Sequence, residues 1–156
     1  MLIEVKVKVG RIIDGKVRKR TEVYVIDKEF FSEAEYAVMQ SLSTEVDEGL
    51  VDAFDIQSLK QSALKEICEQ WYEDYTQRGY PSFIATLRDI FHDDEGNEKQ
   101  LKYKVLLWAE NLTAANRRAL ELSHQGYDML IEGIKQVDYT YLVENDANGE
   151  GDTETV

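Results

Sequence analysis

Apolar and polar residues alternate along the opening of the chain, and this pattern predicts a β-hairpin. Apolar side chains occupy every second position, the period of a strand with one buried face: Ile3, Val5, Val7 and Val9. The dipeptide Asp14-Gly15 then favours a tight turn, because glycine adopts positive φ at little cost. The return strand places two sets on opposite faces: Val17, Thr21, Val23 and Val25 on one, and Arg18, Arg20, Glu22 and Tyr24 on the other.

The period changes after Ile26 to that of a helix. Ser32 and Glu35 have the spacing of a capping box, and Phe31 can pack against Tyr36 as a hydrophobic staple. One helical face continues through Ala34, Ala37, Val38 and Leu42. A third strand is expected over residues 51–59.

The second half repeats this plan, with Thr113 standing 81 residues after Ser32 as the expected helix cap. Strands are predicted over 83–91 and 101–107, joined by a polar hairpin tip at 92–98. A helix follows with Ala115, Ala119, Leu120 and Leu122. We expect a short turn around 129–131 and a closing strand over 137–142, because residues 137–142 echo 54–59.

Two strand–strand–helix–strand units in one chain predict an α+β protein made of two tandem ββαβ repeats. We expect sheets of antiparallel and mixed strands with the helices packed on one face. A right-handed crossover places the third strand of each repeat parallel to the second and beside the first. The repeats are assigned to residues 1–60 and 82–143.

A connecting helix is predicted between the repeats, over residues 61–81. It depends on an apolar stripe at helical spacing, made of Leu64, Ile67, Cys68, Trp71, Tyr72 and Tyr75. The alternative is that the third strand continues through residues 65–67.

Charge is distributed unevenly along the chain. The formal net charge is −13, yet the first 28 residues hold eight basic and four acidic side chains. The last stretch, residues 144–156, has acidic side chains, no basic ones and few apolar ones. We therefore predict a disordered acidic tail after a basic hairpin and an acidic body.

Recognisable catalytic and metal-binding patterns are missing from the sequence. Cys68 is the single cysteine, and it lies within the apolar stripe, where a thiol usually serves as a small buried side chain. His92 and His124 have no zinc spacing, and the acidic loop 93–98 fits a hairpin tip better than a calcium loop. Without a P-loop, a dinucleotide fingerprint or a nucleophile elbow, we expect no enzyme activity, no catalytic residues, no metal and no cofactor.

The basic hairpin is the one candidate binding site. Basic side chains on a sheet with an aromatic nearby can follow a phosphate backbone and stack bases. The candidate residues for nucleic-acid binding are Lys6, Lys8, Arg11, Lys16, Arg18, Lys19, Arg20 and Tyr24. The same charges would also suit a solvated strand face that protects a sheet edge from aggregation.

Several segments resemble an uncharacterised family of small proteins from gut anaerobic bacteria and their phages, known only as a domain of unknown function. The matching segments are Glu4-Val5-Lys6-Val7, Tyr24-Val25-Ile26-Asp27 before Phe31-Ser32-Glu33-Ala34-Glu35, Asp55-Ile56, Val105-Leu106, Asn111-Leu112 and Asp138-Tyr139-Thr140. The resemblance implies no activity and no site residues. It suggests a phage or mobile-element setting.

These patterns together predict a non-enzymatic binding or accessory protein that acts in nucleic-acid metabolism through the basic hairpin. Single-stranded nucleic acid or a protein is the expected partner, with self-association open. The alternatives are an acidic inhibitor or DNA mimic that binds a basic host protein, and an enzyme without a recognisable motif. The opening alternates instead of forming an apolar block, and no run is long enough to span a bilayer, so we expect a cytoplasmic protein.

Overall fold

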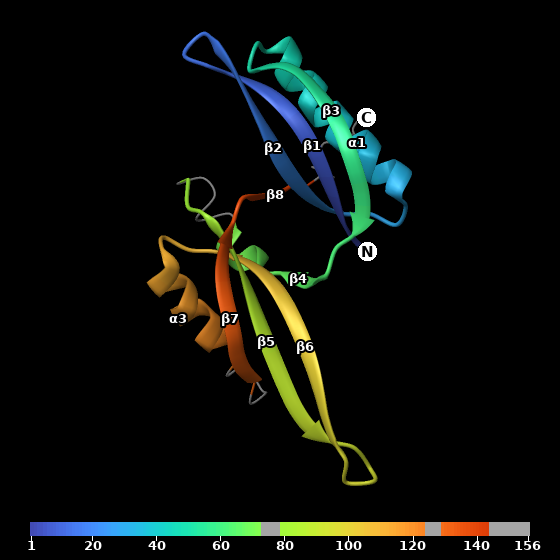
Figure 1. Ribbon diagram of the computed structural model, residues 1–156, viewed down its shortest axis with the longest axis vertical. Coiled ribbons are helices and arrows are strands. Elements are labelled where there is room, and N and C mark those ends of the chain that lie inside the picture. Colours follow the sequence, from blue (N-terminus) through green and yellow to red (C-terminus); the bar gives the residue numbers. More distant parts are fainter. Residues whose placement is uncertain (73–78, 124–128, 144–156) are drawn as a thin grey trace, which may run out of the picture. The chain divides into compact units, whose positions relative to one another are not determined.

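The computed structural model describes residues 1–72, 79–123 and 129–143, which form an α+β structure with two sheets (Figure 1). The chain divides into two compact units. Unit 1 contains Met1–Ser62 and the strand Tyr139–Tyr141, and unit 2 is Ala63–Asp138. The predicted acidic tail, residues 144–156, lies outside the described residues.

Unit 1 is a four-stranded sheet with a helix on one face. Its elements are β1 (Leu2–Ile13), β2 (Lys16–Asp27), α1 (Phe31–Asp47), β3 (Val51–Gln61) and β8 (Tyr139–Tyr141). The strand order is β3-β1-β2-β8, with β8 parallel to β2 and the other neighbours antiparallel. The turn between β1 and β2 has positive φ at Asp14 (53°) and Gly15 (75°), as a primed turn requires.

The core of unit 1 lies between α1 and the sheet. Strand β1 contributes Ile3, Val5, Val7 and Val9, and the helix contributes Ala34, Ala37, Val38 and Leu42, all buried. In Figure 1, α1 runs alongside β3. The helix face predicted from its spacing is therefore the buried one.

Unit 2 has the same kind of construction. Its elements are β4 (Leu64–Ile67), the short 3₁₀ helix η1 (Glu69–Trp71), β5 (Ser82–His92), β6 (Glu98–Trp108), α3 (Leu112–Ser123) and β7 (Met129–Val137). The strand order is β4-β6-β5-β7, and β4 runs parallel to β6. Phe83, Ala85, Val105 and Leu107 of the sheet are buried with Ala115 and Ala119 of the helix.

The predicted helix caps are displaced by two residues. The backbone N–H of Phe30 donates to Glu33 Oε1 (3.1 Å), so α1 begins after Phe30 and Ser32 lies inside its first turn. In unit 2, Asn111 Oδ1 accepts from the backbone N–H of Ala114 (2.9 Å), which makes Asn111 the cap in place of Thr113. Asn111 is a residue suited to a cap, whereas Phe30 has no side-chain acceptor, so at α1 only the bond from its backbone N–H to Glu33 is made.

The predicted connecting helix is wrong over residues 64–67, which form strand β4. The third strand does not continue either, because β3 ends at Gln61 and β4 joins the other sheet. The open edge of β6 supplies partners for this segment, as in the bond from Cys68 N to Leu106 O (2.9 Å). Tertiary pairing therefore overrides a spacing that also suits a helix. Residues 73–78, with Tyr75, lie outside the described residues.

The predicted turn at 129–131 is wrong, and the strand predicted at 137–142 is confirmed at Tyr139–Tyr141 but does not belong to the second unit. Residues 129–137 form the third strand of unit 2, β7, and the chain then enters the sheet of unit 1 as β8. The pairing register between β5 and β7 shifts at Thr86/Leu87. Such a bulge adds one residue on the β7 side, so the period of two that would mark the strand is interrupted.

Pairing registers agree between the two units residue by residue. Val5 pairs with Leu59, and Ala85 pairs with Ile134 at the corresponding place. The shift in register between Lys6 and Val7 matches the one between Thr86 and Leu87. In each unit the fourth strand is supplied by the chain that has just completed the other unit: β4 follows β3, and β8 follows β7.

Candidate nucleic-acid interface

The hairpin register divides the eight candidate residues between the two faces of the unit 1 sheet. Directly paired residues point to the same side. Arg20 pairs with Val9, Arg18 with Arg11 and Lys16 with Ile13, which places these basic residues and Tyr24 on the side covered by α1. Lys19 pairs with Gly10, so it shares the opposite side with Lys6 and Lys8. We call that opposite side the helix-free face.

Glu22 organises the candidate residues on the α1 side. Arg11 donates from Nε to Glu22 Oε2 (2.7 Å) and from Nη2 to Oε1 (2.8 Å). Arg20 Nε donates to Oε2 (2.6 Å), and the Tyr24 hydroxyl donates to Oε1 (2.8 Å). Arg11 also bonds Glu45 of α1. Arg11, Arg20 and Tyr24 are thus engaged within the protein, and Tyr24 is buried, so its ring is not offered to a base.

The ionisation of this network is set by burial and hydrogen bonding together. Burial alone would raise the pKa of Glu22, but hydrogen bonds from Arg11, Arg20 and Tyr24 outweigh it and lower the pKa to about 2. The Glu22 hydrogen bond raises the pKa of Arg11, and burial followed by the same carboxylate raises that of Tyr24. The network therefore holds Glu22 as a carboxylate at neutral pH.

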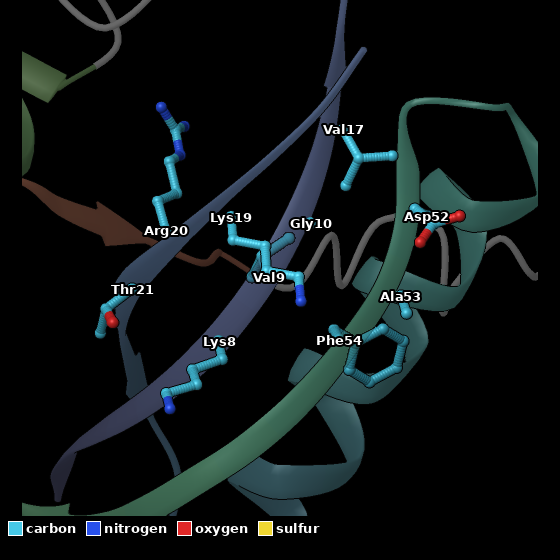
Figure 2. Close-up of a pocket in the computed structure, with 10 residues that line it drawn as sticks. All are labelled: Lys8, Val9, Gly10, Val17, Lys19, Arg20, Thr21, Asp52, Ala53 and Phe54. Atoms are coloured by element: carbon cyan, nitrogen blue, oxygen red, sulfur yellow. The ribbon is translucent and has the colours of Figure 1, made fainter.

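The helix-free face contains a hollow of about 420 Å³ beside Lys8 and Lys19. Figure 2 shows the residues that line it, with Gly10 at its floor next to Lys19. A Cβ at Gly10 would stand 3.1 Å from Val17 Cγ1, so the absence of a side chain there keeps the hollow deep. Lys6, Lys8, Lys19 and Thr21 are exposed on this face.

A second, smaller hollow of about 270 Å³ lies on the same sheet and is lined by Glu4, Lys6, Val23, Ser58, Lys60 and Tyr139. Ser62 Oγ donates to Glu4 Oε2 (2.6 Å), and Lys60 Nζ lies 3.9 Å from Oε1. Burial raises the pKa of Tyr139, and so does its hydrogen bond to Glu4. Lys60 and Tyr139 were not among the predicted site residues. Tyr139 reaches this sheet only because β8 is exchanged between the units, which no local pattern indicates.

Of the residues considered for catalysis, the structure describes Cys68 and His92, which lie at opposite ends of the hairpin formed by β5 and β6. Cys68 is buried, and burial followed by the charge of Glu66 raises the pKa of its thiol to about 12, so the reactive thiolate is disfavoured. His92 is exposed at the end of β5, and His124 lies outside the described residues. Asp93 Oδ1 accepts from the backbone N–H groups of Glu95 and Asn97 (both 2.9 Å), which accounts for the acidic loop as a hairpin turn.

Residues 1–72, 79–123 and 129–143 include no group of three or more His, Cys, Asp or Glu side chains placed to hold a metal ion. Within the same ranges, no helix has the length and apolar character needed to cross a membrane.

The fold and this surface define a two-unit α+β protein with a lysine-bearing sheet face. Residues 1–150 match the model of a family described as a domain of unknown function, DUF4494, and the chain belongs to that family. No curated protein and no solved structure matches the chain.

Proposed function

We propose that this chain is a non-enzymatic accessory protein that binds single-stranded nucleic acid on the helix-free face of unit 1. The observation that supports the proposal is that Lys6, Lys8 and Lys19 share one exposed sheet face, with Lys8 and Lys19 beside the hollow of about 420 Å³ and Lys6 beside the hollow of about 270 Å³. Ammonium groups on such a face attract phosphates, and the hollow offers room for a sugar or a base. A phage or mobile-element setting is part of the same proposal.

A net charge of −13 does not oppose this binding at short range. At physiological salt, exposed charges more than about 8 Å apart are largely screened from one another. A phosphate on the helix-free face therefore responds mainly to the charges nearest to it, which are Lys6, Lys8 and Lys19 together with Asp52 and Asp55. The acidic remainder slows the approach of nucleic acid, and contacts between lysines and phosphates make the affinity fall with salt.

We further infer that the two units are copies of one ancestral ββαβ module with its exchanged fourth strand. The matching registers and the two equivalent bulges support this inference, because independent folds would not share them. The correspondence also shows which charges are peculiar to unit 1. The equivalents of Lys6, Lys8 and Lys19 are Thr86, Arg88 and Gln100, and Arg88 lies 3.6 Å from Glu132. Unit 2 thus carries one of the three positive charges.

A fluorescence anisotropy titration with labelled oligothymidylate tests the proposal. The variant Lys6→Ala/Lys8→Ala/Lys19→Ala should bind at least about tenfold more weakly than the wild type at low salt. The matched control Lys16→Ala/Arg18→Ala/Lys99→Ala removes the same charge elsewhere and should bind within about twofold of the wild type.

Absence of binding by the wild type at low salt would overturn the proposal, and so would equal weakening by both triple variants. A chain that captures a basic protein but has no affinity for nucleic acid would instead act as the acidic inhibitor or DNA mimic considered from its composition. Turnover of the oligonucleotide would point to an enzyme.

A further inference from the structure

The outward side of α1 exposes an unusual number of large apolar side chains. Tyr36 is 64% exposed, and Phe31, Met39 and Val46 of the same helix are also exposed. Phe30 before the helix and Leu50 after it extend this set. Single exposed apolar residues are ordinary, but a continuous group along one element marks an interaction surface. We call this group the α1 surface.

These side chains are not needed for the core of unit 1. The buried side of the helix is formed by Ala34, Ala37, Val38 and Leu42. Met39 and Val46 are seven residues apart, which returns them to one side of the helix, and Tyr36 lies one turn before Met39. These three side chains form a strip beside the buried face, with Tyr36 farthest from it, whereas Phe31 lies in line with Val38 and Leu42 and is exposed at the end of the helix.

The charge around the strip restricts what can bind there. Helix α1 carries Glu33, Glu35, Glu45 and Asp47 and has no lysine or arginine. Glu45 is occupied by Arg11, whereas Glu33, Glu35 and Asp47 border the strip. These carboxylates repel nucleic acid and anionic lipid, and they would also repel the same surface of a second copy. A basic protein segment is the occupant whose charge is complementary.

Helix α3 occupies the equivalent place in unit 2, and a comparison of the two helices shows which residues of the α1 surface are peculiar to α1. Leu112 and Leu120 stand where α1 has Phe31 and Met39, and both are exposed. Asn116 and Arg117 stand where α1 has Glu35 and Tyr36. The apolar positions occur in both helices, whereas Glu33, Glu35 and Tyr36 of α1 have Ala114, Asn116 and Arg117 at the equivalent places of α3.

We propose that the α1 surface binds a basic amphipathic segment of another protein. Apolar side chains of that segment would cover Tyr36 and Met39, and its lysines or arginines would lie against Glu33, Glu35 and Asp47. When one helix binds another in this way, the contacts are made by apolar side chains that recur at helical spacing. This binding is independent of the nucleic-acid interface, which is on the other side of the sheet.

The probe is a labelled helical peptide with one leucine face and one lysine face, titrated by anisotropy. Tyr36→Ser/Met39→Ser should weaken its binding at least about tenfold, because apolar anchors dominate such interfaces. The matched control Leu112→Ser/Leu120→Ser removes exposed apolar side chains from α3 and should leave the affinity unchanged. Glu35→Gln/Asp47→Asn should weaken binding and flatten its salt dependence.

Three results would overturn the proposal. The first is equal weakening by the α3 control, and the second is equal affinity for a peptide with glutamate in place of lysine. The third is sedimentation of the protein alone as a dimer that Tyr36→Ser/Met39→Ser dissociates, since a second copy would then occupy the surface. The Lys6→Ala/Lys8→Ala/Lys19→Ala variant should still bind the peptide, so failure of nucleic-acid binding is distinguished from failure here.

Discussion

Glu22 is the residue that decides which positive charges of the hairpin are available to a ligand. It accepts hydrogen bonds from Arg11, Arg20 and Tyr24 on the side of the sheet that α1 covers. Lys6, Lys8 and Lys19 project on the opposite face, beyond its reach. The basic residues that cluster in the sequence are thereby separated into a group that stabilises the fold and a group that is available for binding.

Replacing this carboxylate should destabilise unit 1. Glu22→Gln removes the charged acceptor of Arg20 and one of the two charged acceptors of Arg11, the other being Glu45, and it does so at a buried position, at a cost of about 2–3 kcal/mol in the free energy of unfolding. Urea denaturation at pH 7 measures it. Glu121→Gln, an exposed change on α3, should alter stability by less than about 0.5 kcal/mol. Similar losses in both variants would mean that the network does not stabilise the fold.

Acidification should weaken the same hydrogen-bond network, because it protonates Glu22. The pKa of Glu22 is about 2 in the folded protein, below its ordinary value of 4.5, so the carboxylate stabilises the folded state above about pH 4.5. This contribution should be lost progressively as the pH falls from 4.5 towards 2. Unfolding free energies measured along this range should fall more steeply for the wild type than for Glu22→Gln. Parallel curves for the two proteins would contradict the assignment.

At the scale of elements, the exchanged fourth strands make the completion of each sheet depend on the chain that follows the other unit. Strand β8 pairs with β2, from which it is separated by all of unit 2 in the sequence. Leu142 N also donates to Val25 O (2.9 Å), which extends the pairing beyond the strand. The edge of unit 1 is therefore completed only when the chain has passed through unit 2.

Thr140→Pro should open this edge. Proline removes a backbone donor and cannot continue the ladder, so the amides of Val23 and Val25, which face β8, should exchange with solvent about tenfold faster or more. Thr140→Val keeps the backbone donor and is the control. Hydrogen exchange read by mass spectrometry or NMR measures both variants. Unchanged exchange in β2 would show that β8 contributes nothing to the sheet.

Regular periodicity allowed part of the fold to be predicted from sequence. The alternation of Ile3, Val5, Val7 and Val9 and the Asp14-Gly15 turn lead directly to the hairpin, and the spacing of Ala34, Ala37 and Leu42 leads to α1. Strand β7 was not predicted, because its bulge interrupts the period of two. Strand β4 lay within the predicted connecting helix, and β8 was predicted as a strand but assigned to the wrong unit, because the partners of short edge strands are distant in sequence.

The candidate site was partly predictable for a similar reason. Strand alternation alone separates Lys6 and Lys8 from the buried valines, and composition alone marks the hairpin as basic. The engagement of Arg11 depends on Glu45, which lies in another element, and the position of Tyr139 depends on the strand exchange. Contacts between elements of this kind require the tertiary structure.

At the scale of the whole molecule, both faces of the unit 1 sheet carry charges of both signs, and the lysines of the helix-free face are those that no carboxylate network engages. Lys6, Lys8 and Lys19 share that face with Glu4, Asp52 and Asp55, whereas the acids of α1 lie on the covered side with Arg11 and Arg20. The logarithm of the affinity for oligothymidylate should fall linearly with the logarithm of salt concentration, and the slope should lessen by about 2 in Lys6→Ala/Lys8→Ala/Lys19→Ala. A slope shared with the wild type would mean that these lysines do not contact phosphates.

The most direct measurement is a map of amide chemical shifts during titration of the isotope-labelled protein with oligothymidylate. We expect the largest changes along the helix-free face, around Lys6, Lys8, Gly10, Lys19 and Thr21, with small changes in α1. Changes that cluster on α1 or in unit 2, or spectra that the oligonucleotide leaves unaltered, would contradict the account.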